Sequence, residues 1–279
     1  MKNLGYYNGN FDEIENIYIP MNDRACYFGD GVYDAAYSRN YKIFGLDAHI
    51  DRLFNSARLL EIKIPKTKQE FKELLQEMVN KMDTGDNFVY FQVTRGTDKI
   101  RNHVFCEGEA NIWINIYPKK VVDIQTKVKL ITVEDTRFLH CNIKTLNLLP
   151  SVMAAQKAKE AGCFEAVLHR AGRVTECSHC NVHILKNSTF ITAPCDNLIL
   201  PGITRAQLIA ICKQLNIDVC ERAFSVEEMM DADEVMISSV STLCLAAEEI
   251  DGKAVGGKDT KTLKLIQNAI LKQYLEETK

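Results

Sequence analysis

The sequence lacks the features that mark export, membrane insertion and nucleic-acid binding. Residues 1–7 contain no long apolar stretch followed by a cleavage site of small residues, and no apolar run is long enough to span a bilayer. The formal net charge is -3, and there is no basic stripe of the kind that nucleic acid requires. We therefore expect a cytoplasmic protein that binds neither a membrane nor a nucleic acid.

Cysteines at a repeating spacing are also missing, as are internal repeats and low-complexity segments. The ten cysteines are scattered along the chain, and a chain without an export signal is expected in a reducing compartment, so we predict free thiols. What is present is typical of a globular protein, with 46% hydrophobic and 25% charged residues. A chain of 279 residues favours two domains over one.

Hydrophobic periodicity alternates along the chain between the spacing of strands and that of helices. This alternation predicts an α/β (α+β) protein of two domains with mixed sheets. Periodicity is lost around residues 118–120, so the smaller N-terminal domain is placed at residues 1–118 and the larger C-terminal domain at residues 119–279. Strands are expected at residues 31–37, 42–44, 87–94, 111–117, 128–133, 165–169, 181–185, 190–192, 219–222 and 234–237, and helices at residues 46–60, 67–82, 150–161, 205–215 and 260–275.

One expected helix start has the composition of an anion site. In residues 200–205 (LPGITR), Gly202 lets the backbone turn and Thr204 lies at the start of the helix. The unpaired N–H groups and the positive end of the helix dipole favour a phosphate at such a terminus. Most capped helices bind nothing, however, so an ordinary capped helix remains the more common alternative.

Two further segments carry reactive side chains whose role their spacing leaves open. Arg101 and His103 lie in a polar loop between strands, where they could bind a carboxylate or face solvent. Lys144 is surrounded by apolar residues in CNIKTLNLL. Such a lysine either extends its ammonium group to solvent or serves as a desolvated amine. From these residues alone, the chain is a two-domain α/β protein with the features of an enzyme.

Four potential metal ligands crowd into residues 177–183 (CSHCNVH): Cys177, His179, Cys180 and His183. Structural zinc usually joins one ligand pair to a second pair at some distance. Here the pairs interleave, and in a strand that begins at Asn181 alternate side chains point to opposite faces. The sequence therefore favours no metal site.

Six segments, in order and over nearly the whole chain, resemble the class IV aminotransferases, and within that family the branch that acts on D-amino acids. They are residues 28–33 (FGDGVY), 49–53 (HIDRL), 90–97 (YFQVTRGT), 143–149 (IKTLNLL), 174–176 (VTE) followed by 181–182 (NV), and 202–205 (GITR). The resemblance implies a fold type IV enzyme with pyridoxal 5'-phosphate (PLP) at the domain interface.

The resemblance also assigns roles to individual residues. It implies that Lys144, in the second domain, carries PLP and is the catalytic base, and that Glu176 faces the pyridine nitrogen. Arg52 would bind the cofactor phosphate together with the N–H groups of Ile203 and Thr204, and Ser239 and Val240 would lie beside the cofactor. The substrate carboxylate would be bound by Tyr33, Arg101 and His103.

The implied activity is transfer of an amino group between a D-amino acid, such as D-alanine, and a 2-oxo acid, such as 2-oxoglutarate. In that branch the loop with the arginine and histidine comes from a neighbouring subunit, so a homodimer is implied. The alternatives are aminodeoxychorismate lyase, a branched-chain L-amino-acid aminotransferase, and a catalytically silent or metal-binding protein on the same scaffold. Val240 departs from the family pattern, which usually has a hydroxyl there, as do Cys177 and Cys180, which stand in a serine-rich run.

Overall fold

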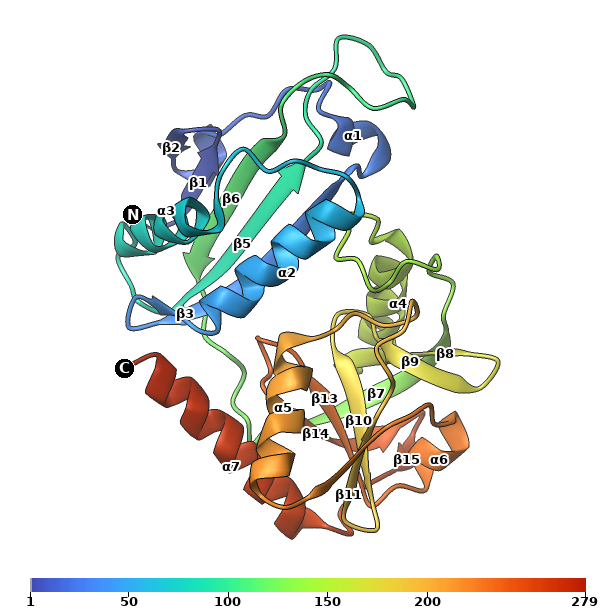
Figure 1. Ribbon diagram of the computed structural model, residues 1–279. Helices are drawn as coiled ribbons and strands as arrows, with labels where there is room; N and C mark the ends of the chain where they lie inside the picture. Colours follow the sequence, from blue (N-terminus) through green and yellow to red (C-terminus); the bar gives the residue numbers. More distant parts are fainter. Residues whose placement is uncertain (1) are drawn as a thin grey trace. The chain divides into compact units, whose positions relative to one another are not determined.

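The computed structural model describes residues 2–279, which divide into two compact units (Figure 1). The first unit contains the chain as far as Lys120, together with Ile143–Asn147 and Leu275–Lys279. The second unit contains Val121–Asn142 and Leu148–Tyr274.

The first unit is built on a six-stranded sheet with the order β2-β1-β6-β5-β3-β4, in which every pair is antiparallel. In Figure 1, helix α2 lies across the middle of this sheet. The strands are β1 (Leu4–Tyr7), β2 (Asn10–Asp12), β3 (Gly31–Arg39), β4 (Lys42–Ile43), β5 (Asn87–Thr94) and β6 (Asn111–Pro118), and the helices are η1 (Ile14–Asn16), α1 (Arg24–Phe28), α2 (Leu46–Leu59) and α3 (Lys68–Asn80).

The core of the first unit follows from the helical spacing of its apolar residues. Ile50 and Leu53 of α2, and Phe71 and Leu75 of α3, are fully buried in one hydrophobic cluster with the inward side chains of the sheet. Helix α3 begins at a capping box, in which Thr67 and Glu70 satisfy each other's backbone N–H groups. The sheet and its two long helices therefore provide a rigid support for residues on β3 and α2.

The second unit contains a nine-stranded mixed sheet with the order β12-β11-β10-β13-β14-β7-β8-β9, and β15 pairs with β14. Three of its pairs are parallel: β11–β12, β14–β7 and β7–β8. The expected α/β architecture with mixed pairing is present, although the mixed sheet is confined to this unit. The strands are β7 (Lys127–Glu134), β8 (Glu165–Arg170), β9 (Arg173–Cys177), β10 (Asn181–Lys186), β11 (Thr189–Thr192), β12 (Asp218–Glu221), β13 (Glu234–Ser238), β14 (Leu245–Ile250) and β15 (Lys253–Ala254), and the helices are α4 (Leu149–Glu160), α5 (Ile203–Gln214), α6 (Val226–Met230) and α7 (Thr260–Glu277).

The segment that carries Lys144 belongs to the first unit, whereas the sequence placed it in the C-terminal domain. The physical reason is backbone pairing with β3. The N–H of Tyr33 donates to the carbonyl oxygen of Lys144 at 3.0 Å. The N–H of Leu146 donates to the carbonyl oxygen of Gly31 at 3.1 Å. Hydrophobic periodicity cannot reveal such a short bridge, because it involves so few residues.

Strand β9 and the turn after it were not expected from the sequence. Ala171 and Gly172, both at positive φ, close a tight hairpin between β8 and β9. The N–H of Cys177 then donates to the carbonyl oxygen of Cys180 at 2.7 Å and closes the turn between β9 and β10.

All ten cysteines are free, as predicted. Among the helices of residues 2–279, none is long and apolar enough to cross a bilayer.

His183, on β10, makes the stability of the second unit depend on pH. Its ring is buried, with Nδ1 2.9 Å from Thr192 Oγ1 and Nε2 2.7 Å from Ser238 Oγ. Burial, assisted by the charge of Arg205, lowers the pKa of His183 from 6.5 to about 3. The unfolded chain therefore binds a proton at a pH where the folded chain does not.

We expect His183→Gln to flatten the acid limb of the stability curve. In the wild type, this histidine contributes stability that is complete above pH 6.5 and is lost as the pH falls toward about 3. The loss is about 1.4 kcal/mol for each pH unit. Urea denaturation at a series of pH values measures this slope, and above pH 6.5 the two proteins should show the same pH dependence. An equally steep acid limb in the variant would rule out His183 as the source.

Candidate active site

In the first unit, the amine of Lys144 is held against the face of Tyr33. Lys144 Nζ lies 4.2 Å from the centre of the Tyr33 ring, and the backbone N–H of Lys144 donates to Ser56 Oγ at 3.3 Å. Gly31 allows this close approach of the segment to β3, because a Cβ there would lie 2.7 Å from Leu146 Cδ1 and 2.8 Å from the carbonyl oxygen of Val93. The lysine is therefore fixed on a sheet rather than on a mobile loop.

Next to Tyr33 on β3, the buried carboxylate of Asp34 forms hydrogen bonds with two basic residues of α2. It accepts hydrogen bonds from Nε and Nη2 of Arg52 and from Nδ1 of His49, each at 2.8 Å. Burial alone would raise the pKa of Asp34, but the charge of Arg52 and the hydrogen bonds from Arg52 and His49 hold it well below its usual range. Asp34 is thus ionised and orients the guanidinium of Arg52.

His49 completes this hydrogen-bonded group as a neutral ring. Burial lowers its pKa, and its Nδ1 must carry the proton because the Asp34 carboxylate can only accept. Its Nε2 is buried, and no residue of the described chain hydrogen-bonds it. A buried polar atom without a partner is uncommon in proteins and is often found where a ligand or water binds.

Tyr33 also packs against a side chain of β5, the strand that pairs with β3. Its ring stacks on Tyr90 of β5, with ring centres 5.4 Å apart. The Tyr90 hydroxyl donates to Gln92 Oε1 at 2.7 Å, and burial raises the pKa of Tyr90, which keeps this donor protonated. The ring against which Lys144 lies is therefore held by the packing of two strands.

Arg101 and His103 lie on the loop between β5 and β6, residues 95–110. The Arg101 guanidinium is 4.8 Å from the centre of the Phe28 ring, and the His103 ring centre is 5.1 Å from it. Within residues 2–279 of one chain, neither side chain has a hydrogen bond or ring contact with Tyr33. The cluster of these three residues was predicted across two subunits, so it stays a prediction in the structure of a single chain.

The buried side chain of Arg24 holds this loop by hydrogen bonds to backbone carbonyls of the loop. Its Nη1 donates to the carbonyl oxygens of Asn102 at 2.6 Å and Val104 at 3.0 Å, and its Nε pairs with Asp30 at 2.8 Å. These two carbonyls flank His103, so the position of its backbone depends on the Arg24 guanidinium.

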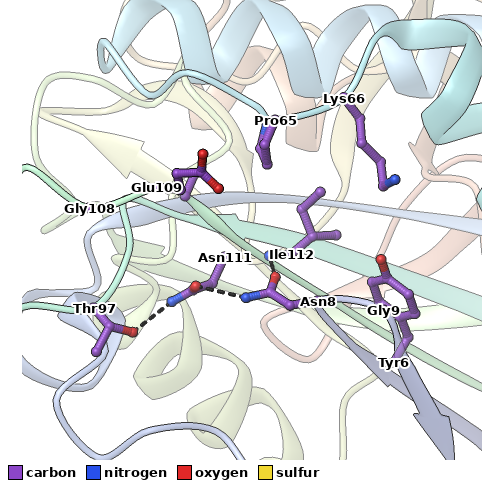
Figure 2. A pocket seen from close by; sticks show the side chains of 11 residues that line it. Tyr6, Asn8, Gly9, Pro65, Lys66, Thr97, Gly108, Glu109, Asn111 and Ile112 are labelled. Carbon is purple, nitrogen blue, oxygen red and sulfur yellow. Dashed lines mark hydrogen bonds between the residues drawn. The ribbon is translucent and has the colours of Figure 1, made fainter.

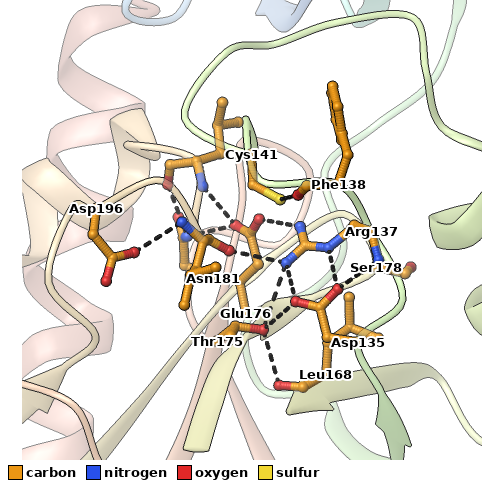
Figure 3. A network of polar contacts seen from close by, with 12 residues as sticks. Asp135, Arg137, Phe138, Cys141, Leu168, Thr175, Glu176, Ser178, Asn181 and Asp196 are labelled. Carbon is orange, nitrogen blue, oxygen red and sulfur yellow. Dashed lines mark hydrogen bonds and ion pairs between the residues drawn. The ribbon is translucent and has the colours of Figure 1, made fainter. Parts of the chain in front are cut away.

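In the second unit, Glu176 is enclosed by a polar network (Figure 3). Arg137 Nη1 donates to Glu176 Oε1, while Arg137 Nε and Nη2 donate to the two oxygens of Asp135 at 3.0 and 2.9 Å. Burial alone would raise the pKa of Asp135, but its hydrogen bonds with Arg137 hold it below the usual range. One guanidinium therefore pairs with two buried carboxylates, Asp135 and Glu176.

The second oxygen of Glu176 connects it to the turn before α5. Glu176 Oε2 accepts from Asn181 Nδ2 and from the N–H of Leu200, both at 3.1 Å. A Cβ on Gly202 would lie 1.9 Å from Asn181 Oδ1, so only glycine fits beside this amide. The structure thus brings Glu176 together with the start of the helix that carries Ile203 and Thr204.

Helix α5 begins at Gly202 with no hydrogen bond from a capping side chain. Ile203 and Thr204 are its first two residues, so their N–H groups lie beyond the reach of intrahelical acceptors. After β13, Ser239 Oγ lies 2.9 Å from Ser241 Oγ and 3.0 Å from Thr242 Oγ1, and Val240 stands between these hydroxyls. The second unit thus offers backbone donors, hydroxyls and one ionised carboxylate.

A cavity of about 540 Å³ in the first unit lies apart from these residues (Figure 2). Asn8 and Asn111 hydrogen-bond each other at 2.9 Å at one side of it. None of the site residues expected from the sequence is among the residues that line it, which are Tyr6, Asn8, Gly9, Pro65, Lys66, Thr97, Gly108, Glu109, Ala110, Asn111 and Ile112.

Sequence reasoning missed the residues that orient the expected ones, namely His49, Asp34, Arg24, Arg137 and Asp135. A signal existed for Asp34, because an aspartate in the apolar run GVYDAAY must be paired if that strand is buried. His49 and Asn181 fell within the segments that carry the family resemblance, but no role was assigned to them. Nothing in the local sequence indicated that Arg137 pairs with Glu176.

Comparison with known proteins places this arrangement in a family. Residues 31–250 match the model of the aminotransferase class IV family, and the chain belongs to that family. It is 40% identical over 269 residues to a D-alanine aminotransferase of Listeria monocytogenes, covering 93% of this chain and 92% of the relative. It is 37% identical over 276 residues to a D-alanine aminotransferase of Bacillus licheniformis, covering 98% and 97%.

Solved structures share the fold. The branched-chain amino acid aminotransferase of Escherichia coli superposes with a TM-score of 0.89 at 21% identity, covering all of this chain and 96% of the other. A branched-chain aminotransferase crystallised with pyridoxamine 5'-phosphate gives 0.88 at 23% identity, covering 96% and 93%. The protein is an aminotransferase that depends on PLP.

The donor set fits this cofactor. The first unit supplies the amine of Lys144 and the guanidinium of Arg52. The second unit supplies an ionised carboxylate and an uncapped helix start. An aldehyde, a phosphate and a pyridine nitrogen need groups of these kinds.

We expect Arg24→Ala to loosen the 95–110 loop without unfolding the sheet. The variant leaves the carbonyls of Asn102 and Val104 without their shared donor, so amide hydrogen exchange in residues 101–105 should become faster. Hydrogen-exchange mass spectrometry measures this, with the exposed Arg58→Ala as a matched control. Unchanged exchange in the loop would mean that Arg24 does not hold it.

We expect Arg137→Met to destabilise the protein by about 3 kcal/mol, because it removes one ion pair from each of two buried carboxylates, Asp135 and Glu176. Arg222→Met is the control, since its pair with Glu228 is partly exposed and such pairs contribute about 0–1 kcal/mol. Chemical denaturation compares the two variants with the wild type. Equal losses in both would contradict the central place given to Arg137.

Proposed function

We propose that this aminotransferase transfers the amino group between a D-amino acid, such as D-alanine, and a 2-oxo acid, such as 2-oxoglutarate. The observation that carries the proposal is the contact of the Lys144 amine with Tyr33, a residue type suited to binding a substrate carboxylate beside that amine. The D-alanine aminotransferases that match most of this chain support the same activity.

Lys144 has two tasks in this proposal. It holds the cofactor until a substrate amine takes its place, and it then moves a proton from the α-carbon of the substrate. When bound, PLP supplies an aldehyde and a ring that accepts electrons from the α-carbon. The Tyr33 ring, against which the Lys144 amine lies, is itself held by its packing on Tyr90.

The remaining cofactor residues act through charge. Glu176, kept ionised by Arg137, holds a proton on the pyridine nitrogen. Arg52, oriented by Asp34, binds the phosphate together with the N–H groups of Ile203 and Thr204. Ser239 and Val240 would lie beside the cofactor, where the apolar side chain of Val240 would donate no hydrogen bond.

Tyr33, Arg101 and His103 bind the substrate carboxylate, and their position selects the enantiomer whose α-hydrogen faces Lys144. Since Arg101 and His103 contact Phe28 in their own chain, we propose that they serve Tyr33 of a second copy in a homodimer.

We also propose that the enzyme works in the cytoplasm, where its ten free thiols would stay reduced. The domain division is proposed as residues 1–118 and 119–279 along the chain, with Lys144 returning to the first unit.

The test combines a spectrum with an assay of the purified protein. We expect an absorption band of bound PLP near the border of the visible and ultraviolet that is absent in Lys144→Ala. With D-alanine, pyruvate should form only when 2-oxoglutarate is present. Loss of the base should lower the rate by about 10²-fold or more.

Each alternative gives a different result. Pyruvate formed from aminodeoxychorismate without an amino acceptor would indicate the lyase, and activity on L-leucine but not D-alanine would indicate a branched-chain enzyme. A protein that stays colourless after addition of PLP would overturn the assignment of Lys144.

A further inference from the structure

Three metal-ligating side chains of different chemistry meet in the second unit, next to the Glu176 network. They are Glu165 of β8, and His179 and Cys180 of the turn between β9 and β10. One ligand atom from each, a carboxylate oxygen, an imidazole nitrogen and the sulfur, all lie within 4.8 Å of one another. The sequence did not indicate this group, because Glu165 lies far from the turn along the chain.

The Glu165 carboxylate is fixed and turned toward the other two. It is fully buried, and its Oε1 accepts from the N–H groups of Ala166 at 2.7 Å and Ser178 at 3.3 Å. Its Oε2 lies 2.5 Å from His179 Nδ1, yet it has no well-directed hydrogen bond from any residue of the described chain. A buried carboxylate oxygen without a directed donor is costly unless a cation lies beside it, either a protonated His179 or a metal ion.

The two turn residues differ in exposure in a way that suits an ion arriving from solvent. Cys180 is 4% exposed, and its backbone is fixed by the hydrogen bond from the N–H of Cys177. The His179 side chain is 56% exposed, so its ring is accessible to solvent, while its Nδ1 contacts Glu165 Oε2 and lies 3.0 Å from Ser178 Oγ. Two ligands are therefore preorganised, and the third lies at the surface.

We propose that Glu165, His179 and Cys180 bind a divalent transition-metal ion of the zinc class. Zinc accepts sulfur, imidazole nitrogen and carboxylate oxygen together, and a fourth position can be filled by water. Magnesium and calcium prefer all-oxygen sites, so the thiol disfavours them. On binding, Cys180 loses its proton to solvent, and the turn is tied to β8.

An ordinary ion pair between His179 and Glu165 is the competing interpretation. It explains the short contact of these two residues, whereas only a metal site bonds the Cys180 sulfur to an ion. The test must therefore detect the sulfur as well as the metal, and it is independent of the proposed substrate.

The experiment uses the full chain with its cofactor, purified without chelators or added thiols. Calorimetric titration with Zn²⁺ should show one site per chain, and His179→Ala, an exposed substitution, should weaken binding at least about tenfold. The controls His140→Ala and Cys195→Ser remove an exposed histidine and an exposed cysteine of the same unit. Both should bind Zn²⁺ as the wild type does.

Co²⁺ then reports on the ligands directly. We expect a difference spectrum with a thiolate charge-transfer band in the near ultraviolet and ligand-field bands toward the red, and Cys180→Ser should abolish the former. Equal Zn²⁺ affinity in wild type and His179→Ala, or a Co²⁺ spectrum without a thiolate band, would overturn the proposal and leave only the ion pair. Thermal melts without metal establish that the variants are folded.

Discussion

The guanidinium of Arg137 is the interaction on which the second unit's chemistry depends. Two buried carboxylates lose their hydration and repel each other's charge, which raises the free energy of the ionised form of each. Arg137 offsets both effects, since its planar fork faces Asp135 on one side and Glu176 on the other. Asn181 and the N–H of Leu200 complete the coordination of Glu176 and fix the turn that precedes α5. A carboxylate and an uncapped helix start are thereby held together.

In the first unit the central charge is negative: one buried carboxylate binds two basic side chains, whereas in the second unit one guanidinium binds two carboxylates. Asp34 is the buried anion, and it orients Arg52 and a neutral His49. Lys144 meets an aromatic face rather than a carboxylate. An aromatic neighbour attracts the ammonium without accepting its proton, so the amine is positioned but not neutralised by an ion pair. Such a partner suits the role proposed for Lys144, in which it alternates between holding a group and moving a proton.

Much of the fold could be predicted from periodicity, because long elements such as α3 and β5 repeat their apolar residues over several turns or alternations. Strand β9 could not, since it is short, charged at its start and defined by a hairpin at positive φ. The family resemblance drew attention to Lys144 and Glu176, whereas Arg137 and Arg24 act across distances along the chain that no local pattern encodes. The cluster of Glu165 with His179 and Cys180 was missed for the same reason: local spacing shows only the ligands of one turn.

The assignment of residues 143–147 and 275–279 to the first unit has a consequence for how the molecule can be divided. The chain leaves this unit after Lys120, returns to lay Lys144 on β3, leaves again and returns to end beside Arg39 and Asn40, which donate to the carbonyl oxygen of Thr278. A gene cut at the apparent boundary would yield an N-terminal fragment without its lysine and without the tail that covers the β3–β4 turn. The two units are therefore distinct in space but inseparable as polypeptides, and recombination between relatives can exchange them only by exchanging all these segments together.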